Sequence, residues 1–425
     1  MRDVIVVGAG PAGSSTSSFL ARSGYDVLLL DKEKFPRDKP CGDGQGPRSV
    51  EMLKELGVYE VMKEKGCHRL YGAILSSPNG NICKADIREA DIERVTRFWK
   101  PRKMFEDIIK TDIENLAGFS TPRKIFDNIL KDAAIRFGAE LIEEFRVTDL
   151  IIEDGKICGV KGKYQGEIVE HRSKLVVGAD GARSIVARRL GIFHQRPEHI
   201  VYGLRAYYEN VKGLTDLIEV YFDKDILPGY IWIFPISKDM ANVGVGMLAR
   251  DYNKSSRTLQ EYLQKFIATN KFAIEKFQDA KMVGHPLGWR LPLGGQAVKN
   301  HPPGALLVGD AASFIDPFTG EGVCAALESG KMAAEVIAIA LERNDFSVES
   351  LGEYERRWRE RFEEDFKYSL RLKWLASSPW RVNYLVKKAS RDKDLAMLLV
   401  GILTNIFPQK AVFKAATLLK LLRPF

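Results

Sequence analysis

The turn Gly8-Ala9-Gly10-Pro11-Ala12-Gly13 constrains the fold of this 425-residue chain more than any other segment. It follows the apolar run DVIVV and precedes PAGSSTSSFLARSG, which has the composition of a buried helix. In such a turn the first glycine permits a tight bend, the second lets the backbone approach a pyrophosphate, and the third lets the helix pack on the strand. The helix N-terminus then faces the anion. Asp31 ends the next apolar run, where a carboxylate can hold a ribose hydroxyl, so the segment predicts a dinucleotide-binding unit.

Two later turns favour a flavin over a nicotinamide nucleotide. Gly309-Asp310 follows the apolar run GALLV, and a carboxylate there can accept hydrogen bonds from a ribityl chain. The stretch PFTGEG (317–322) then offers backbone N–H groups at the start of a long helix. A helix N-terminus stabilises the negative charge that a reduced flavin carries on its pyrimidine edge. The cofactor is therefore predicted to be FAD.

The order of the elements predicts an α/β fold with a doubly wound, Rossmann-like FAD domain interleaved with an antiparallel-sheet substrate domain. Residues 1–70, 120–190 and 285–345 are assigned to the FAD domain, and residues 71–119 and 191–284 to the substrate domain. The second set contains a hairpin with its turn at Asn79-Gly80 and a charged, mostly helical insertion at 86–118. Thr121 is the expected N-cap of a helix that ends at Gly138.

A basic helical region, residues 346–425, completes the chain. From Phe366 onward it holds twelve Lys or Arg residues and only two Asp, whereas the whole chain has a net charge of +8. A basic helical region with apolar faces can lie on an anionic membrane surface, although a helical cap packed on the core has the same composition. Its longest apolar stretch, residues 395–407, is too short to span a bilayer. No nucleic-acid recognition motif is present.

The cysteine pattern and the N-terminus indicate the compartment. Five cysteines without C-x-x-C spacing suggest neither a disulfide framework nor a metal site. The chain starts with MRDVIVVGAG and shows no signal peptide pattern. We expect a cytoplasmic protein, peripheral on the inner face of the membrane.

One short strand is apolar on both faces. In LPGYIWIFP (227–235), Tyr230, Trp232 and Phe234 alternate with Ile231 and Ile233. In an extended chain the three aromatic rings share one face and the isoleucines share the other. We expect the isoleucines to hold the strand in its sheet and the aromatic face to border a cavity, while an ordinary core strand is the alternative.

These motifs together resemble a known group of flavoproteins. GAGPAG, ADGARS and GDAASFIDPFTGEG are similar to the FAD-dependent group that includes aromatic hydroxylases, flavin halogenases and geranylgeranyl reductases. DKPCGDG (38–44) and LPGYIWIFP with VGVGM resemble the geranylgeranyl reductase family in particular. The resemblance covers most of residues 1–340. It implies saturation of isolated double bonds in the polyprenyl chain of a lipid, quinone or related isoprenoid, by hydride from reduced flavin plus a proton.

The resemblance also implies roles for individual residues. Cys41 and Tyr230 are the candidate catalytic proton donors, although packing against the flavin ring is the alternative for Cys41, and Glu321 is a further group that can titrate near the flavin. For Arg123 the alternative is a surface charge, although a helix start disfavours a cation without an anionic partner. The implied substrate-binding residues are Tyr230, Trp232, Phe234 and Pro235. The implied cofactor-binding residues are Gly8, Gly10, Ala12, Gly13, Asp31, Lys32, Cys41, Gly42, Gly44, Arg123, Val147, Asp310, Gly320, Gly322 and Val323.

Two other functions remain open from sequence. The first is an FAD-dependent aromatic monooxygenase or halogenase; halogenases carry Trp-x-Trp-x-Ile-Pro, from which Tyr230 and Phe234 depart. The second is a non-catalytic flavoprotein that docks to a membrane or a partner through its C-terminal region. Only one G-x-G-x-x-G turn is present, so the electron donor is expected to be transiently bound NAD(P)H or a small redox protein.

Overall fold

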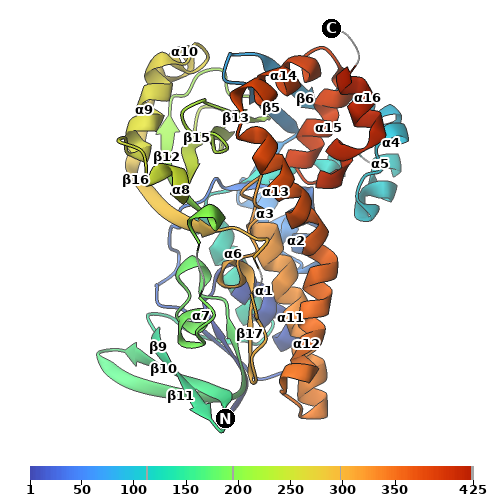
Figure 1. Ribbon diagram of the computed structural model, residues 1–425. Coiled ribbons are helices and arrows are strands. Elements are labelled where there is room, and N and C mark those ends of the chain that lie inside the picture. Colours follow the sequence, from blue (N-terminus) through green and yellow to red (C-terminus); the bar gives the residue numbers. More distant parts are fainter. Residues whose placement is uncertain (112, 194–195, 297, 423–425) are drawn as a thin grey trace.

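The glycine-rich turn follows the first strand of a mixed seven-stranded sheet in the lower half of the molecule (Figure 1). The computed structural model describes residues 1–111, 113–193, 196–296 and 298–422. The strand order is β8-β2-β1-β11-β10-β9, with β17 paired to β11. Strands β8, β2, β1, β11 and β17 run parallel, β10 pairs antiparallel with β11, and β9 pairs antiparallel with β10. In chain order the strands are β1 (Arg2–Val7), β2 (Val27–Leu30), β8 (Glu140–Ile142), β9 (Arg146–Glu153), β10 (Lys156–Tyr164), β11 (Glu167–Gly178) and β17 (Ala305–Leu307).

Helices from distant parts of the chain share one buried core with this sheet. The closest contact joins the helix after the glycine turn to the long helix near residue 330. A side chain at Gly330 would lie 2.6 Å from the carbonyl oxygen of Ala12, so the two helices need a glycine where they meet. The helices of this half are α1 (Pro11–Arg22), α2 (Pro47–Glu55), α3 (Tyr59–Glu64), α6 (Arg123–Arg136), α7 (Ile185–Arg189), α11 (Val323–Arg343) and α12 (Val348–Trp358).

A second seven-stranded sheet forms the upper half. Its order is β16-β12-β15-β14-β13-β5-β6, and only β13 and β5 pair in parallel. A third, three-stranded sheet, β3-β7-β4, completes the architecture. The strands are β3 (Gly44–Gln45), β4 (His68–Leu70), β5 (Gly72–Ser76), β6 (Ile82–Asp86), β7 (Gly118–Ser120), β12 (Ile200–Glu209), β13 (Ile218–Tyr221), β14 (Tyr230–Pro235), β15 (Ala241–Leu248) and β16 (Lys281–Pro292).

Helices cover both faces of the second sheet (Figure 1). One face packs against α9, where Leu263 and Phe266 join Ile231 and Ile233 in a buried cluster. The other face contributes to a cluster with the C-terminal helices. The helices involved are α8 (Ala249–Tyr252), α9 (Leu259–Thr269), α10 (Ala273–Phe277), α13 (Glu364–Ala376), α14 (Pro379–Ala389), α15 (Lys393–Leu403) and α16 (Ala415–Leu422).

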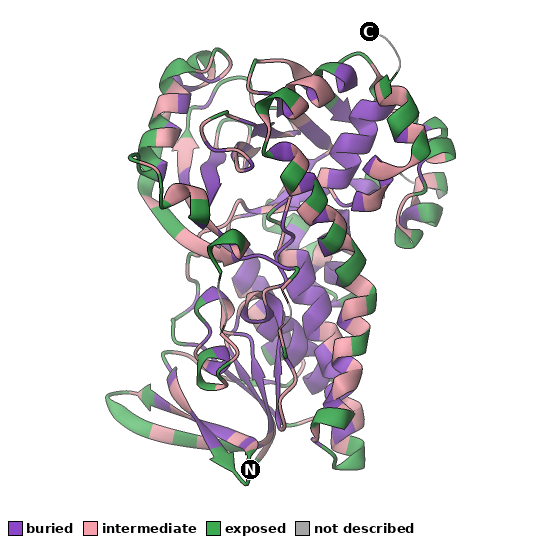
Figure 2. Cartoon of the chain, in the orientation of Figure 1, coloured by how far each residue is buried: buried purple, intermediate pink, exposed green. Residues whose placement is uncertain are grey.

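The charged insertion and the C-terminal region are packed on each other. The insertion contains α4 (Ile92–Phe98) and α5 (Glu106–Thr111). Arg94 pairs with Asp394 at 2.6 Å, and the fully buried Trp99 donates a hydrogen bond to Thr417 at 2.7 Å. The apolar stretch within 395–407 forms the buried helix α15 rather than a surface element (Figure 2). No helix among the described residues is long and apolar enough to cross a membrane.

The predicted fold class is confirmed, with two local differences. Helix α6 begins at Arg123, and Thr121 does not cap it: the N-cap is Pro122, without a side-chain hydrogen bond. The backbone N–H of Thr121 donates a hydrogen bond to the carbonyl oxygen of Asp43. The proposed domain boundary at residue 285 falls inside β16, which continues its pairing with β12 to Pro292. Arg423, included in the charge of the C-terminal region, lies outside the described residues.

Candidate active site

The glycine-rich turn is shaped by backbone contacts that exclude side chains. Gly8 has φ +103°, and a side chain there would lie 2.5 Å from the carbonyl oxygen of Ala179. A side chain at Gly13 would lie 1.8 Å from the carbonyl oxygen of Gly8. At Gly10 the nearest atom would be 3.8 Å away, so this glycine faces open space at the N-terminus of α1. The turn therefore presents a bare, helix-terminated cradle that suits a pyrophosphate.

Asp31 fixes the turn from the neighbouring strand end. Its Oδ2 accepts a hydrogen bond from the N–H of Ala9 at 2.7 Å, and its Oδ1 accepts one from Glu33 at 2.9 Å. The backbone carbonyl of Asp31 accepts a hydrogen bond from Phe145, which brings β9 alongside. Val147 follows in β9 and lines neither cavity described below, and Lys32 is exposed beside Asp31. Their assignments stay predictions.

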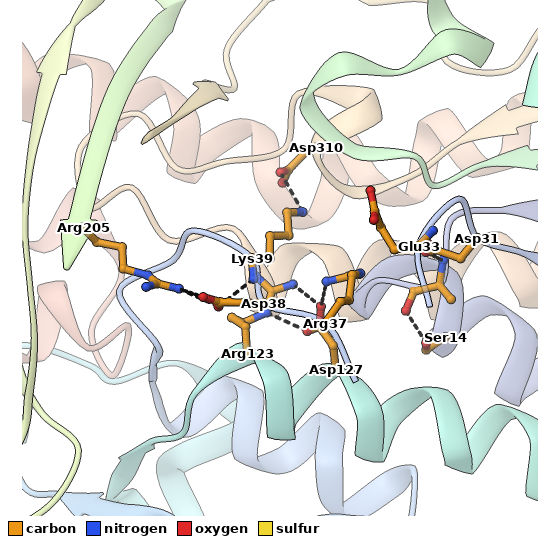
Figure 3. A network of polar contacts seen from close by, with 11 residues as sticks. Ser14, Asp31, Glu33, Arg37, Asp38, Lys39, Arg123, Asp127, Arg205 and Asp310 are labelled. Carbon is orange, nitrogen blue, oxygen red and sulfur yellow. Dashed lines mark hydrogen bonds and ion pairs between the residues drawn. The ribbon is translucent and has the colours of Figure 1, made fainter. Parts of the chain in front are cut away.

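Three cations, Arg37, Lys39 and Arg123, lie close to one another beside Asp127 and Asp310 (Figure 3). Arg37 and Arg123 both pair with Asp127, at 2.8 and 2.6 Å, and the Asp127 carboxylate is completely buried. Burial alone would raise the pKa of Asp127, but the two guanidinium groups hold it below its ordinary value. Lys39 lies 4.0 Å from Asp310, and burial lowers the pKa of this lysine. Arg123 thus has an anionic partner within its own helix and is not a surface charge.

Two adjoining cavities extend from this region. The first, of about 130 Å³, is lined by the glycine turn together with Lys39, Arg123, Arg205 and Asp310, and we call it the glycine-turn cavity. The second, of about 210 Å³, is mostly apolar and is called the aromatic cavity. The residues that line both cavities are Cys41, Gly42, Gly203, Trp232, Leu291, Gly320, Gly322 and Val323. A dinucleotide seated on the turn would reach this shared boundary with its ring system.

Strand β14 provides the aromatic wall. Tyr230, Trp232 and Phe234 line the aromatic cavity, while Ile231 and Ile233 are buried on the opposite face of the strand. The expected alternation of faces is therefore present. The Phe234 ring lies so close to the Cys41 loop that a side chain at Gly42 would come within 3.0 Å of it. Pro235 is buried at the end of β14 and is not among the lining residues.

A hydrogen-bond cluster that the sequence did not predict holds the Cys41 loop against this wall. The Asn242 amide donates to the carbonyl of Cys41 at 2.7 Å and to Asp43 at 2.8 Å, and accepts from the indole N–H of Trp232 at 2.9 Å. Tyr207 donates to Asp43 at 2.5 Å. Burial raises the pKa of Asp43 to about 6, although the hydrogen bonds from Tyr207 and Asn242 lower it. The one signal in the sequence was a single polar residue, Asn242, within the apolar strand ANVGVGML.

Of the two implied catalytic residues, Cys41 lies at the boundary between the cavities, and Tyr230 lines the aromatic cavity. Burial raises the pKa of the Cys41 thiol, although Arg123 opposes the shift, so the thiol is protonated at neutral pH. The Tyr230 hydroxyl donates a hydrogen bond to the carbonyl oxygen of Thr319, and burial raises its pKa as well. Both groups are thus acids of low strength in this site.

The loop before α11 closes the boundary from the other side. The Asp316 carboxylate accepts hydrogen bonds from the backbone of Phe318 at 2.9 Å and of Thr319 at 2.8 Å, which sets the bend. Gly320 follows at φ +71°, a left-handed conformation that favours glycine. Gly322 and Val323 then begin α11, so the positive end of this helix points to the shared boundary. The residues present therefore fit FAD, with its pyrophosphate on the glycine turn and its ring beside Cys41.

Comparison with known proteins agrees with this geometry. A family model described as an FAD binding domain matches residues 1–364. A digeranylgeranylglycerophospholipid reductase of Methanosarcina acetivorans is 35% identical over 374 residues, 87% of this chain and 84% of that protein. A crystal structure of a geranylgeranyl bacteriochlorophyll reductase-like protein from Thermoplasma acidophilum aligns with a TM-score of 0.79 at 26% identity, over 97% of this chain and 98% of that one. A flavin-dependent brominase aligns with a TM-score of 0.74 at 22% identity, over 98% and 96% of the two chains, and shares the fold.

Proposed function

The chain belongs to the geranylgeranyl reductase family of FAD-dependent oxidoreductases, and we propose that it saturates isolated double bonds in a polyprenyl chain carried by a lipid. One observation carries this proposal: a mostly apolar cavity meets the cofactor cavity at Cys41 and Trp232. An isoprenoid chain is apolar along its whole length and needs such a lining. FAD bound in the glycine-turn cavity supplies the hydride for the reduction.

The residues of the chain then have three tasks. Glycine-turn backbone and the cations around Asp127 hold the anionic part of the cofactor. Tyr230, Trp232 and Phe234 hold one face of the alkene against the shared boundary and keep water from it. Tight positioning in a dry site is what an unactivated double bond requires. Cys41, whose thiol is protonated, and Tyr230 border the reacting atoms in this arrangement.

The contact of Tyr230 with the loop before α11 favours this function over halogenation. Its hydroxyl bonds to the Thr319 carbonyl and so joins the aromatic wall to the loop before α11. A tryptophan at this position, as in the halogenase pattern, has no hydroxyl to place there. The likeness to the brominase concerns the fold alone.

Lys373 suggests which lipid is used. It lines the aromatic cavity, and burial together with Arg250 lowers its pKa to about 8. Its ammonium donates only to the carbonyl oxygen of Glu198, at 3.2 Å, and pairs with no carboxylate among the described residues. A partly desolvated cation near a second cation favours an anionic ligand. We therefore propose a phospholipid substrate rather than a quinone.

The C-terminal region carries the surface proposed to meet the membrane. Trp374 and Trp380 are 64% and 71% exposed, and the Arg381 guanidinium lies 4.0 Å from the Trp374 ring centre. Leu419 and Leu422 on α16 are 62% and 79% exposed. Exposed tryptophans among basic residues suit the interface of an anionic bilayer. This membrane-facing surface would give a cytoplasmic enzyme access to lipids from the inner face.

The test is anaerobic. The FAD-loaded protein is reduced with dithionite and mixed separately with a geranylgeranyl phospholipid and with menaquinone, while flavin reoxidation and product mass are followed. We expect reoxidation with the phospholipid and a gain of two hydrogen atoms per double bond. Oxygen-dependent turnover of an aromatic compound, with no mass gain in any prenyl chain, would refute the proposal. Replacing dithionite by NADPH or by a reduced ferredoxin distinguishes the two proposed electron donors.

A further inference from the structure

A half-buried carboxyl group, Glu321, lines the aromatic cavity at its boundary with the glycine-turn cavity. It sits between Gly320 and Gly322, which line both cavities. No other Asp or Glu lines the aromatic cavity among the described residues. Its Oε1 accepts a hydrogen bond from the backbone N–H of Cys324 at 2.5 Å, and no other hydrogen bond of this side chain is found within the described part of the chain. One carboxyl oxygen is therefore anchored and the other is available.

We infer that Glu321 is the acid that protonates the alkene, an inference that rests on the proposed function. One alkene carbon accepts a hydride from the reduced flavin, and the other uses the π-electron pair to take the proton of Glu321. Two C–H bonds form, while the alkene π bond, the flavin N–H bond that supplies the hydride and the O–H bond of Glu321 break. The flavin is oxidised and the alkene is reduced by two electrons. The carboxylate left on Glu321 regains its proton from solvent before the next turnover.

The neighbouring proton-bearing groups are less suited to this role. The Tyr230 hydroxyl is committed to the carbonyl of Thr319. Burial keeps the Cys41 thiol a weak acid, with a pKa raised above its ordinary value. Lys373 donates to the backbone of Glu198, and Tyr71 packs under the guanidinium of Arg88 at 4.1 Å. Among the described residues that line the aromatic cavity, Glu321 is the one with the acidity of a carboxyl group.

A buried glutamate, Glu328, keeps Glu321 protonated. Arg48 pairs with Glu328 at 2.5 Å and Arg361 pairs with it at 2.8 Å, so both cations are used by Glu328. Burial alone would raise the pKa of Glu328, but these arginines lower it to about 2. Two nearby carboxyls whose environments separate their pKa values are a common arrangement for one acid and one permanent charge.

Glu321 is the acid of this pair, and Glu328 is the permanent charge. Burial raises its pKa to about 7, Arg48 opposes the shift, and the charges of Glu328 and Asp316 add to it. The thiol of Cys324 on α11 is a further titratable group close to it. Glu321 therefore holds a proton below this pH and gives it up above, which matches a general acid that works near neutral pH.

The test compares Glu321→Gln with wild type and with Glu209→Gln, a control at an exposed site outside both cavities. Glutamine keeps the acceptor for the Cys324 N–H but has no acidic proton. We expect single-turnover reduction of a geranylgeranyl phospholipid to fall at least about 100-fold. In wild type the rate should decline as pH rises through about 7, and this limb should be absent in Glu321→Gln. Glu321→Asp, which keeps an acid, should restore the limb, whereas a merely structural defect would not be rescued.

A measurement without turnover accompanies the kinetics. Infrared spectra of the oxidised FAD-loaded protein should show the carbonyl band of a carboxylic acid that disappears above pH about 7 and is missing in Glu321→Gln. Glu328→Gln should shift this titration to lower pH, because it removes a negative charge and frees Arg48 for Glu321. Wild-type rates or an unchanged band in Glu321→Gln would overturn the inference while leaving the reductase function intact. A wild-type protein that reduces no prenyl chain would overturn both.

Discussion

Replacing Asn242 by alanine should destabilise the protein and release the Cys41 loop from the aromatic wall. The Asn242 side chain is fully buried and makes hydrogen bonds to three partners: Cys41, Asp43 and Trp232. Each of the two neutral bonds contributes about 1 kcal/mol and the bond to the Asp43 carboxylate about 1.5–3 kcal/mol. The expected loss in the free energy of unfolding is therefore about 3–5 kcal/mol, since the abandoned groups stay buried.

The loss should depend on pH through Asp43. Its folded pKa of about 6 lies above the ordinary value of 3.8, so its ionisation reduces stability as pH rises through this range. Asn242 donates to the ionised form, and its removal should raise this pKa further. The destabilisation should then be larger above pH about 6 than below it.

Urea unfolding of the FAD-loaded protein measures the effect, with Asn128→Ala as the control. Asn128 makes one exposed hydrogen bond, to Asp132 on the same helix, and should change stability by less than about 0.5 kcal/mol. FAD affinity should weaken in Asn242→Ala alone, because only that variant frees the loop bearing Cys41 and Gly42. A loss below about 1 kcal/mol in Asn242→Ala, or a pH-independent one, would refute this account of the loop.

Three further outcomes are expected. Gly10→Val should leave the apo fold intact, because φ is −76° and the nearest atom to an added side chain, Nη2 of Arg37, is 3.8 Å away, an ordinary contact distance. It should nevertheless weaken FAD binding at least about 100-fold by calorimetry. Lys373→Met should weaken the binding of a geranylgeranyl phospholipid about 10- to 100-fold and leave menaquinone binding unchanged. Lys367→Met, at an exposed position, is the control. Equal losses of affinity for both ligands would exclude a contact between Lys373 and the headgroup. Trp374→Ala with Trp380→Ala should reduce co-sedimentation with anionic vesicles while turnover of detergent-dispersed substrate persists; unchanged sedimentation would remove this surface from the membrane proposal.

The sequence predicted the parts of the site that local geometry determines. The glycine turn, its helix and the alternation in β14 depend on neighbours a few residues apart, and each is present. The ion pair between Arg123 and Asp127 was also predictable from sequence, because Asp127 is four residues along the same helix. The N-cap at Thr121 was wrong by one residue: Pro122 occupies the N-cap, and Thr121 lies before it, where its backbone N–H donates to the carbonyl of Asp43 in a distant loop.

The remainder depends on contacts between distant segments. Asn242 meets Asp43 across 199 residues, and Arg48 meets Glu328 across 280. No spacing rule within a single sequence predicts that the two members of either pair meet. Composition also failed to separate surface from core in the C-terminal region. The run in α15 and the exposed leucines of α16 are similarly apolar, yet α15 fills the core beside the second sheet.

The C-terminal helices also contact the loop before α11. The Asp316 carboxylate accepts hydrogen bonds from backbone N–H groups of the loop that bears Gly320 and Glu321. It also accepts hydrogen bonds from Ser369 on α13 at 2.7 Å and from Gln409 at 3.2 Å. The C-terminal helices therefore brace the boundary between the two cavities from behind. Because both partners of Asp316 lie beyond residue 366, deleting this region would disturb the Glu321 loop as well as any membrane contact. Point changes at Trp374 and Trp380, which are exposed, separate the two roles where truncation does not.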